Sequence, residues 1–263
     1  TALRIVCQGV DGNFPGVILA RCHIMTSVVR YKVIIQIKHI KLIGIIEVSA
    51  VSTKFDLLFD QWAGSYDRTV SGHDEEYKAV FAGYDDILTN VADRAEATVL
   101  EFGVGTGNLT KKLLSRGHRV YGVEPSREMR KKAREKLPQI ALFEGDFLHF
   151  PSFDETIHSI VSTYAFHHLT DEEKGEAIGR FRDLLPTGGK VVFADTVFET
   201  DKAKQDMIET VERQGYRNLL KDLQSEYYTT IPVLRRLFVE NGFSEATFSQ
   251  LNQFVWLIEA VKK

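Results

Sequence analysis

The feature that most constrains the fold is a glycine loop placed between a strand and a helix. An apolar run at 98–102 leads into the loop Gly103-Val104-Gly105-Thr106-Gly107, and a helical pattern follows at 109–114. Glycine lets the backbone approach a ligand closely, and a glycine loop at the carboxyl end of a first strand is typical of nucleotide-binding α/β folds. The loop therefore predicts a βαβ unit that binds a ligand at the edge of a sheet.

Strand-length and helix-length segments alternate through the chain. Strands are predicted at 98–102, 119–123, 140–143, 159–163 and 190–194, and helices at 75–91, 109–114, 127–136, 171–185 and 232–240. This spacing predicts a mainly parallel sheet. The last two strands, 246–249 and 254–261, are joined by a turn too short for a parallel crossover, so they form an antiparallel hairpin. We expect an α/β, Rossmann-like class I methyltransferase fold: seven strands, mainly parallel, with an antiparallel last strand and helices on both faces.

Residues 1–50 differ in character from residues 51–263, where we expect the main domain. They contain both cysteines and a β-branched run at 33–43, which predicts a strand or an aggregation-prone stretch. Three interpretations stay open: a small accessory β element, a weakly ordered extension, or sequence upstream of the true start, with Val51 near the native N-terminus. Within the main domain, 201–228 is a polar helical insertion that we expect to cap the substrate pocket.

Composition narrows the class of protein. A net charge of −3 argues against a general nucleic-acid binder. Neither Cys7 nor Cys22 stands in a metal-ligand pattern, so no metal site is expected. The sequence shows no membrane span and no signal peptide. We therefore expect a cytoplasmic protein, a monomer or homodimer, whose partner is a small molecule.

The spacing of the glycines indicates which cofactor binds. Dinucleotide-binding loops follow G-x-G-x-x-G, whose third glycine lets the helix pack on the strand. Here the spacing is G-x-G-x-G, Asn108 stands where that pattern requires glycine, and Glu101 precedes the loop. A cofactor without phosphates needs no pyrophosphate cradle. The loop therefore favours S-adenosylmethionine, with Gly103 and Gly105 as cofactor-binding residues.

Acidic residues follow the second and third predicted strands. Glu124 comes directly after 119–123, where a carboxylate can accept hydrogen bonds from both ribose hydroxyls of an adenosine. Asp146 and Phe147 follow the third strand. An aspartate there can accept a hydrogen bond from the adenine amino group, and the phenylalanine can pack on the ring. These residues predict an adenosine site at the sheet edge.

The end of the fourth strand supplies the candidates for acceptor chemistry. Thr163 is expected to contact the cofactor, and Tyr164 or His167 could remove a proton from the acceptor. His168 is better explained as a helix cap or as a group that fills a polar gap. Tyr66, in an aromatic segment before the first domain helix, is expected to contact the cofactor.

Taken together, these segments resemble the YrrT-type methyltransferases of bacilli, and the match runs from about residue 51 to the end. The resemblance implies the class I fold, S-adenosylmethionine as donor, cofactor contacts at Gly103, Glu124 and Asp146, and a setting near methionine-to-cysteine sulfur recycling. It identifies neither an acceptor nor a catalytic base. Its motifs are 59–62, 66–67, 101–110, 122–126, 144–147, 162–170, 192–196 and 254–256.

The sequence therefore predicts methyl transfer from S-adenosylmethionine to a small-molecule acceptor. Two alternatives from other classes stay open. A non-catalytic protein that binds S-adenosylmethionine or S-adenosylhomocysteine would carry the same motifs. An NAD-dependent oxidoreductase would share Glu124, but the glycine spacing and Asp146 oppose it.

Overall fold

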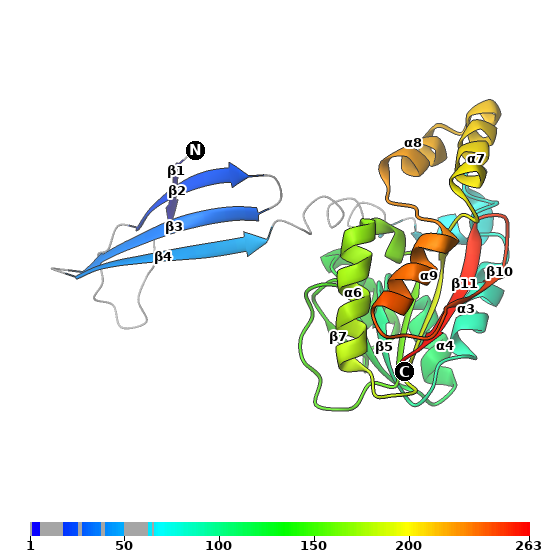
Figure 1. Cartoon of the computed structure of the whole chain (residues 1–263), viewed down its shortest axis with the longest axis horizontal. Coiled ribbons are helices and arrows are strands. Elements are labelled where there is room, and N and C mark those ends of the chain that lie inside the picture. The colour runs from blue at the N-terminus through cyan, green and yellow to red at the C-terminus, as the bar shows by residue number, and fades with distance from the viewer. Residues whose placement is uncertain (1, 6–17, 26–27, 38–39, 50–62, 65) are drawn as a thin grey trace. The chain divides into compact units, whose positions relative to one another are not determined.

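The computed structural model describes the backbone of residues 2–5, 18–25, 28–37 and 40–49, and residues 63–64 and 66–263 with their side chains (Figure 1). The predicted aromatic segment at 55–62 lies outside these residues. The chain separates into two compact units, Thr1–Phe55 and Asp56–Lys263.

The first unit contains a four-stranded antiparallel sheet in the order β1-β2-β3-β4. The run at 33–43, predicted as one strand, contributes to two, β3 and β4. β-branched residues favour extended backbone in both. The strands are β1 (Ala2–Ile5), β2 (Ile18–Met25), β3 (Val28–Ile37) and β4 (Ile40–Ser49).

The second unit is built on a seven-stranded sheet in the order β10-β11-β9-β8-β5-β6-β7. The pairs from β9 to β7 are parallel, whereas β11 is antiparallel to both β9 and β10. The predicted sheet with its antiparallel last strand is confirmed. Its strands are β5 (Thr98–Phe102), β6 (Arg119–Val123), β7 (Ala141–Phe143), β8 (Ser159–Thr163), β9 (Lys190–Thr196), β10 (Thr247–Gln250) and β11 (Val255–Val261).

Alternation along the strands divides the core into two layers, as expected where successive side chains point to opposite faces. Leu100 and Phe102 of β5 belong to one cluster, which includes apolar side chains of α6 (Asp171–Leu184) and α9 (Ile231–Glu240). Val99 of β5 and Val161 of β8 belong to the other, with side chains of α3 (Tyr84–Ala92) and α4 (Asn108–Ser115). Helices thus cover both faces of the sheet (Figure 1).

Local signals fix several helix ends. Thr170 and Glu173 form a reciprocal capping box at the start of α6, and the Ser126 hydroxyl accepts a hydrogen bond from the Met129 N–H at the start of α5.

Among the described residues, no helix combines the length and the apolar character needed to cross a lipid bilayer. The helices and turns are α2 (Tyr66–Arg68), the π-helical turn η1 (Thr69–His73), α3 (Tyr84–Ala92), α4 (Asn108–Ser115), α5 (Arg127–Lys136), the 3₁₀ turn η2 (Phe166–His168), α6 (Asp171–Leu184), α7 (Asp201–Gln214), α8 (Arg217–Ser225) and α9 (Ile231–Glu240).

The prediction of one helix over 75–91 is wrong in its first half. Residues 75–83 form turns, and α3 begins only at Tyr84. Gly83 adopts a left-handed φ of 73°, which interrupts a right-handed helix. Tyr77 and Val80 are buried nevertheless, so the apolar stripe was read correctly while its backbone conformation was not.

Helices α7 and α8 make up the predicted insertion. They follow β9, so they lie beyond the carboxyl end of that strand, and Figure 1 shows them outside the layers of the sheet. Gly215, with a φ of 75°, ends α7 and allows the turn into α8. The chain returns to the sheet through a parallel bridge between Phe198 and Thr230.

Packing around Gly103 leads to a stability prediction. Gly103 has a φ of 69°, and a Cβ added there would lie 2.7 Å from Ala165 Cβ. We expect Gly103→Ala to lower the free energy of unfolding by about 1–3 kcal/mol, because a left-handed backbone and an overpacked contact add together. Urea unfolding monitored by circular dichroism measures the change.

Gly117→Ala is the matched control, since Gly117 also has a positive φ of 82° but an added Cβ there meets nothing within 4 Å. In this variant the free energy of unfolding should fall only by the cost of placing alanine in a left-handed backbone. Equal losses in the two variants would contradict the predicted close approach at Gly103.

Candidate functional site

The glycine loop holds a left-handed backbone at three positions. Gly103, Gly105 and Gly107 have φ values of 69°, 55° and 87°. The Gly103 N–H donates to the Val123 carbonyl at 2.9 Å, which joins the start of the loop to the end of β6. The loop therefore lies at the carboxyl ends of β5 and β6, as the sequence predicted.

Glu124 lies at the same edge and is fixed by the backbone around it. Its Oε2 accepts a hydrogen bond from the Gly105 N–H at 2.9 Å, and its Oε1 accepts one from the Ser126 N–H at 2.9 Å. The side chain is 4% exposed. A carboxylate oxygen can accept more than one hydrogen bond. The structure thus brings Gly105 and Glu124, two of the predicted site residues, into direct contact.

Asp146 organises a turn after β7. Its Oδ1 accepts hydrogen bonds from the Leu148 and His149 N–H groups, each at 2.7 Å, and the His149 ring lies 3.2 Å from both carboxylate oxygens. The neighbouring Phe147 is buried, and its ring stacks on Phe102 with centroids 5.0 Å apart. The predicted adenine contacts of both residues stay predictions, and the observed packing of Phe147 is with the core.

Tyr66 lies over the glycine loop. A Cβ at Gly105 would be 4.0 Å from Tyr66 Cε1. Burial, followed by the neighbouring Tyr84, Tyr164 and Glu124, raises the pKa of Tyr66 well above its ordinary value. The phenol is therefore protonated at neutral pH. The predicted contact of Tyr66 with the cofactor stays a prediction.

A cluster that sequence reasoning missed ties the segment around Tyr66 to the loop. Asp67 Oδ1 accepts hydrogen bonds from the Thr106 hydroxyl at 2.6 Å and from Asn108 Nδ2 at 3.1 Å. Asp67 Oδ2 pairs with Lys136 Nζ at 2.6 Å. Asn108 therefore has a structural partner at the position where a dinucleotide loop has glycine.

Glu101 lies beneath the loop as a buried acid. It is 1% exposed, and the Thr110 hydroxyl donates to its Oε2 at 2.6 Å. Burial raises the pKa of Glu101 to about 8, and the nearby Glu124 adds to the shift, whereas the Thr110 contacts oppose it. The loop is thus supported by a carboxyl group whose charge depends on pH near neutrality.

The end of β8 carries the predicted acceptor-side residues. Thr163 ends the strand, in register with Ala194 of β9. Tyr164 follows with a φ of 54°, which is uncommon for a residue with a side chain and occurs most often at functional or strained positions. Its ring packs on Phe81, with centroids 5.0 Å apart, and its hydroxyl lies 3.4 Å from the Val80 carbonyl.

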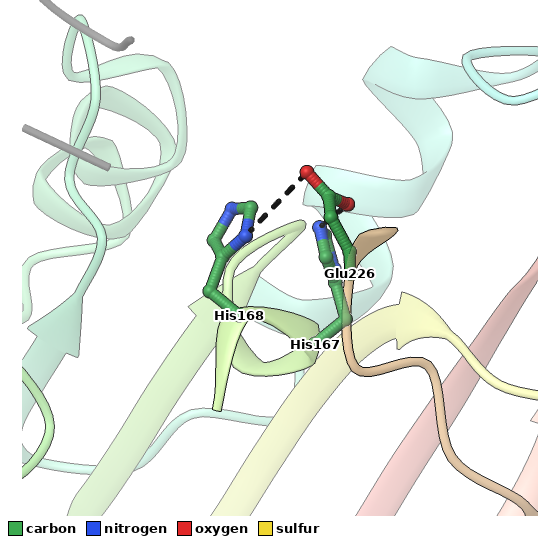
Figure 2. A group of neighbouring side chains, drawn as sticks. All are labelled: His167, His168 and Glu226. Atoms are coloured by element: carbon green, nitrogen blue, oxygen red, sulfur yellow. Dashed lines mark ion pairs between the residues drawn. The ribbon is translucent and has the colours of Figure 1, made fainter. Parts of the chain in front are cut away.

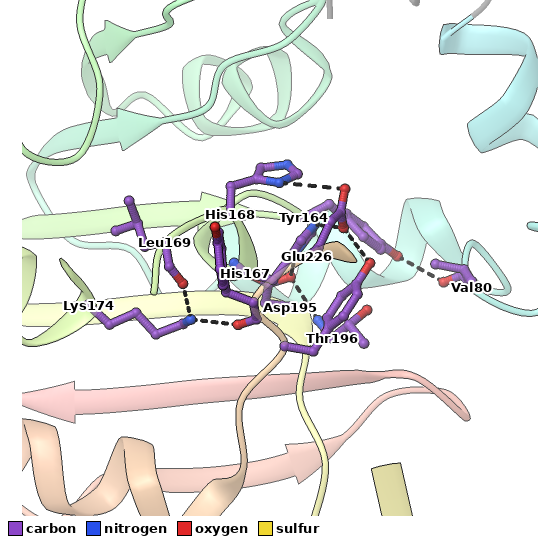
Figure 3. Close-up of polar contacts among 11 residues, drawn as sticks. Val80, Tyr164, His167, His168, Leu169, Lys174, Asp195, Thr196 and Glu226 are labelled. Atoms are coloured by element: carbon purple, nitrogen blue, oxygen red, sulfur yellow. Dashed lines mark hydrogen bonds and ion pairs between the residues drawn. The ribbon is translucent and has the colours of Figure 1, made fainter. Parts of the chain in front are cut away.

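His167 is held by Asp195 at the end of β9 (Figure 3). The His167 backbone N–H donates to Asp195 Oδ2 at 2.8 Å, and Nδ1 lies 2.5 Å from Asp195 Oδ1. A carboxylate only accepts, so Nδ1 carries a hydrogen and Nε2 is the nitrogen that faces the other side. The ring of Tyr228 stacks on His167 with centroids 4.8 Å apart. The predicted His167 is therefore held in one orientation.

Glu226, just after α8, completes this group. Its Oε2 lies 3.3 Å from His167 Nε2 and accepts a hydrogen bond from the Tyr228 hydroxyl at 2.6 Å. Its Oε1 lies 3.7 Å from His168 Nδ1. Figure 2 shows both rings beside one carboxylate.

The surroundings shift the pKa values of His167, His168 and Glu226 far from their ordinary values. Burial opposes charge on His167, but Asp195 and Glu226 outweigh it and raise its pKa to about 10. Burial and the neighbouring His167 lower the pKa of His168 to about 3. Burial also opposes charge on Glu226, yet the two histidines and Tyr228 lower its pKa to about 2.

Lys174, another residue that the sequence did not single out, secures the group from α6. It is 1% exposed, and its Nζ donates to the Leu169 carbonyl and, at 2.7 Å, to the Tyr227 carbonyl. These bonds connect the turn that carries His167 and His168 to the segment that carries Glu226. Burial lowers the pKa of Lys174, although Asp171 and Asp195 favour its charged form.

A cavity of about 60 Å³ lies beside this group. It is lined by Tyr66, which lies beside the glycine loop, and by Tyr164, His167 and His168 from the predicted acceptor side. Its other walls come from the insertion and neighbouring turns: Tyr77, Val80, Phe81, Thr196, Leu219, Asp222, Leu223, Glu226, Tyr228 and Phe254.

Cysteine and histidine residues at close spacing are the usual sequence signal of a metal site. Such spacing does not pair His167 and His168 with Glu226, because the carboxylate lies in the insertion, far along the chain. Adjacent histidines after a strand were the only available signal. Asp195 could have been found from its position at the end of the fifth parallel strand, where polar residues meet the same edge as Tyr164.

The chain is similar in sequence to known methyltransferases. Residues 99–189 match a family model described as a methyltransferase domain. The chain is 59% identical over 207 residues to an uncharacterized methyltransferase of Geobacillus sp. (strain WCH70), covering 78% of this chain and 97% of the relative. It is 54% identical over 214 residues to one of Bacillus cytotoxicus, covering 81% of this chain and 100% of the relative.

Solved structures show the same fold at low sequence identity. Magnesium protoporphyrin IX methyltransferase from Synechocystis PCC 6803, with bound SAM, aligns with a TM-score of 0.60 at 16% identity, covering 82% of this chain and 99% of that one. Human N-acetylserotonin methyltransferase in complex with SAM aligns with a TM-score of 0.55 at 17% identity, covering 80% of this chain and 60% of that one. The sheet is thus that of the class I methyltransferases.

The buried Glu101 predicts a pH dependence of stability. Its folded-state pKa of about 8 exceeds the ordinary 4.5, so the folded protein holds a proton that the unfolded chain releases between these values. Stability from this group is complete below the unfolded pKa and is lost as pH rises through the folded pKa, by up to about 1.4 kcal/mol per pH unit.

We expect Glu101→Gln to remove this loss, because an amide oxygen can still accept the Thr110 hydrogen bond but does not ionise. Urea unfolding across this pH range measures it: the stability of the variant relative to the wild type should rise with pH. Glu135→Gln, at an exposed position on α5, is the control and should keep the wild-type slope. Parallel slopes for wild type and Glu101→Gln would contradict the prediction.

Proposed function

Because the chain belongs to a family of methyltransferases found in bacilli, we propose that it transfers a methyl group from S-adenosylmethionine to a small-molecule acceptor. The observation that carries the proposal is the glycine loop, whose backbone is left-handed at three glycines and whose Gly105 N–H donates to the buried carboxylate of Glu124. When bound, the donor supplies an electrophilic methyl group on a sulfonium sulfur.

The residues at the sheet edge fit such a ligand. A Cβ at Gly103 would lie 2.7 Å from Ala165 Cβ, so the loop can approach the turn after β8 this closely only because the residue is glycine. The buried Ser162 hydroxyl, 3.9 Å from that Cβ position, finds no hydrogen-bond partner among the residues that the structure describes. Ser162 is thus a further candidate for a cofactor contact.

We assign the cofactor roles as the sequence predicted them. Gly103 and Gly105 approach the donor with their backbone, Glu124 accepts the ribose hydroxyls, and Asp146 accepts from the adenine amino group. Tyr66 and Thr163 border the reacting end. Phe147 packs on the adenine ring in this proposal, and its own ring also stacks on Phe102 of the core.

On the acceptor side, the geometry favours His167 over Tyr164. The Tyr164 hydroxyl lies near the Val80 carbonyl, and burial, with Tyr84 and Asp195, raises the pKa of Tyr164 well above its ordinary value. That phenol stays protonated and is a poor base. His167 borders the cavity with an orientation fixed by Asp195. Its raised pKa of about 10 keeps it protonated at neutral pH as well, so its role is that of a hydrogen-bond donor and not that of a base. In-line transfer needs an acceptor held in one orientation, and His167 is placed to hold it.

We further propose that residues 51–263 form the methyltransferase domain and that α7 and α8 cap its acceptor pocket. Leu219 and Leu223 of α8 line the cavity, which supports the cap. The sequence resemblance to YrrT-type proteins supports an acceptor linked to sulfur recycling, such as a small thiol or amine, in a cytoplasmic monomer or homodimer.

Calorimetric titration of the purified chain with S-adenosylmethionine, S-adenosylhomocysteine and NAD tests the donor site. We expect binding of the first two and a loss of about tenfold or more in Glu124→Ala, because that variant removes a charged hydrogen-bond acceptor. The carboxylate at Glu135, exposed on α5, provides the control, and Glu135→Ala should bind as the wild type does.

Circular dichroism establishes that both variants are folded before titration. Binding of NAD in place of S-adenosylmethionine would overturn the proposed donor. An equal affinity of Glu124→Ala and wild type would overturn the role of Glu124.

A further inference from the structure

Two imidazoles and one carboxylate converge beside the cavity at distances close to those of metal ligands (Figure 2). His167 Nε2 lies 3.3 Å from Glu226 Oε2, and His168 Nδ1 lies 3.7 Å from Glu226 Oε1. Each of the three side chains offers a ligand atom within 4.8 Å of the others. Ligand atoms of a tetrahedral zinc ion, with bonds of about 2.0–2.2 Å, lie roughly 3.3 Å apart. Small side-chain movements would therefore close a site.

The contact between His167 and Glu226 needs a positive species between its atoms. Nδ1 of His167 already donates to Asp195, so Nε2 faces the Glu226 carboxylate. A lone pair facing a carboxylate oxygen is unfavourable, so Nε2 must hold either a proton or a cation. Glu226 also accepts from the Tyr228 hydroxyl, which fixes one of its oxygens on the His167 side.

We propose that His167, His168 and Glu226 bind one divalent transition-metal ion, with zinc as the best match. Two histidines and one glutamate form a known type of zinc ligand set, and imidazole ligands select transition metals over magnesium and calcium. Asp195 supplies the carboxylate that holds a metal-bound histidine through its other nitrogen. These ligands come from η2 and from the segment after α8.

The residues around the three proposed ligands hold the backbone of these ligands in place. Lys174 ties the carbonyl of Leu169 to that of Tyr227, so the histidine turn and the glutamate segment are held together from α6. Figure 3 shows this network around His167 and Asp195. Ligands on a fixed backbone lose little conformational entropy on binding, which raises the affinity of the metal.

Three protein ligands leave a coordination position available. All three border the cavity of about 60 Å³, where water or the reacting group of an acceptor has room. A metal there would lower the pKa of a coordinated hydroxyl or thiol, which favours an oxygen or sulfur acceptor. This role rests on the proposed function, whereas the binding of the metal does not.

The test is calorimetric titration of the full chain, stripped of metal by a chelator, with zinc chloride. Absorption of the cobalt(II)-substituted protein gives a second readout, because d–d bands report the coordination number. We expect equimolar zinc binding in the wild type, and a loss of about a hundredfold or more in His168→Asn and in Glu226→Gln. Asp195→Asn should weaken binding by about 10–100-fold.

His149→Asn is the control, since His149 also lies beside a carboxylate, that of Asp146, but on the surface. It should bind zinc as the wild type does. Thermal unfolding in the presence of chelator shows which variants fold. If His168→Asn does not fold, the zinc affinity of Glu226→Gln decides the outcome.

Absence of equimolar zinc binding in the wild type would overturn the proposal and assign a proton to His167 Nε2. Undiminished affinity in Glu226→Gln would overturn it equally. Titration of the same preparations with S-adenosylhomocysteine separates the two proposals. If S-adenosylhomocysteine binds and zinc does not, only the metal site fails; if zinc binds and S-adenosylhomocysteine does not, only the donor fails.

Discussion

The buried carboxylate of Asp195 is the contact on which the proposed acceptor side of this methyltransferase depends. Asp195 is 3% exposed and accepts three hydrogen bonds, from the backbone N–H of His167, from His167 Nδ1 and from the backbone N–H of Thr196. A buried charge is unfavourable unless it is paired and hydrogen-bonded. The end of β9 and the turn after β8 are therefore held together. The orientation of the His167 ring is fixed in the absence of a ligand, with Nδ1 toward Asp195.

A second buried charged residue, Lys174, connects this turn to the segment that carries Glu226. Lys174 donates to the carbonyls of Leu169 and Tyr227, so the turn after β8 and the segment after α8 share one cation. Glu226 is placed by this connection, and it meets the side of His167 that Asp195 does not use. The strained backbone at Tyr164, with its φ of 54°, lies at the start of the same turn and is retained because the surrounding bonds fix it.

The parts of this arrangement that are local in sequence were predictable. The mainly parallel sheet and its closing antiparallel hairpin follow from the spacing of apolar runs, and the position of Gly105 and Glu124 at one sheet edge follows from the two strand ends that precede them. The helix over 75–91 was wrong because one left-handed glycine outweighed a helical apolar stripe. Glu226 could not be found, because its partner histidines lie before α6, β9 and the insertion, and no local pattern joins them. Lys174 was missed for a related reason: its importance lies in burial, which residue type alone does not indicate. Asp195 was also missed, although its position at the end of a parallel strand was a usable signal.

The topology explains why the two halves of the site are built from different parts of the chain. The strand order reverses between β5 and β8, and ligands of open α/β sheets bind at such a reversal. Gly103 follows β5 and Ala165 follows β8, and their close approach shows that the two sides meet there. Residues from β5 to β7 form the candidate donor side, whereas the turn after β8, the end of β9 and the insertion form the proposed acceptor side. Because the two sides come from different segments of the chain, substitutions in α8 or at Glu226 lie apart from the backbone of the glycine loop and from its contact with Glu124.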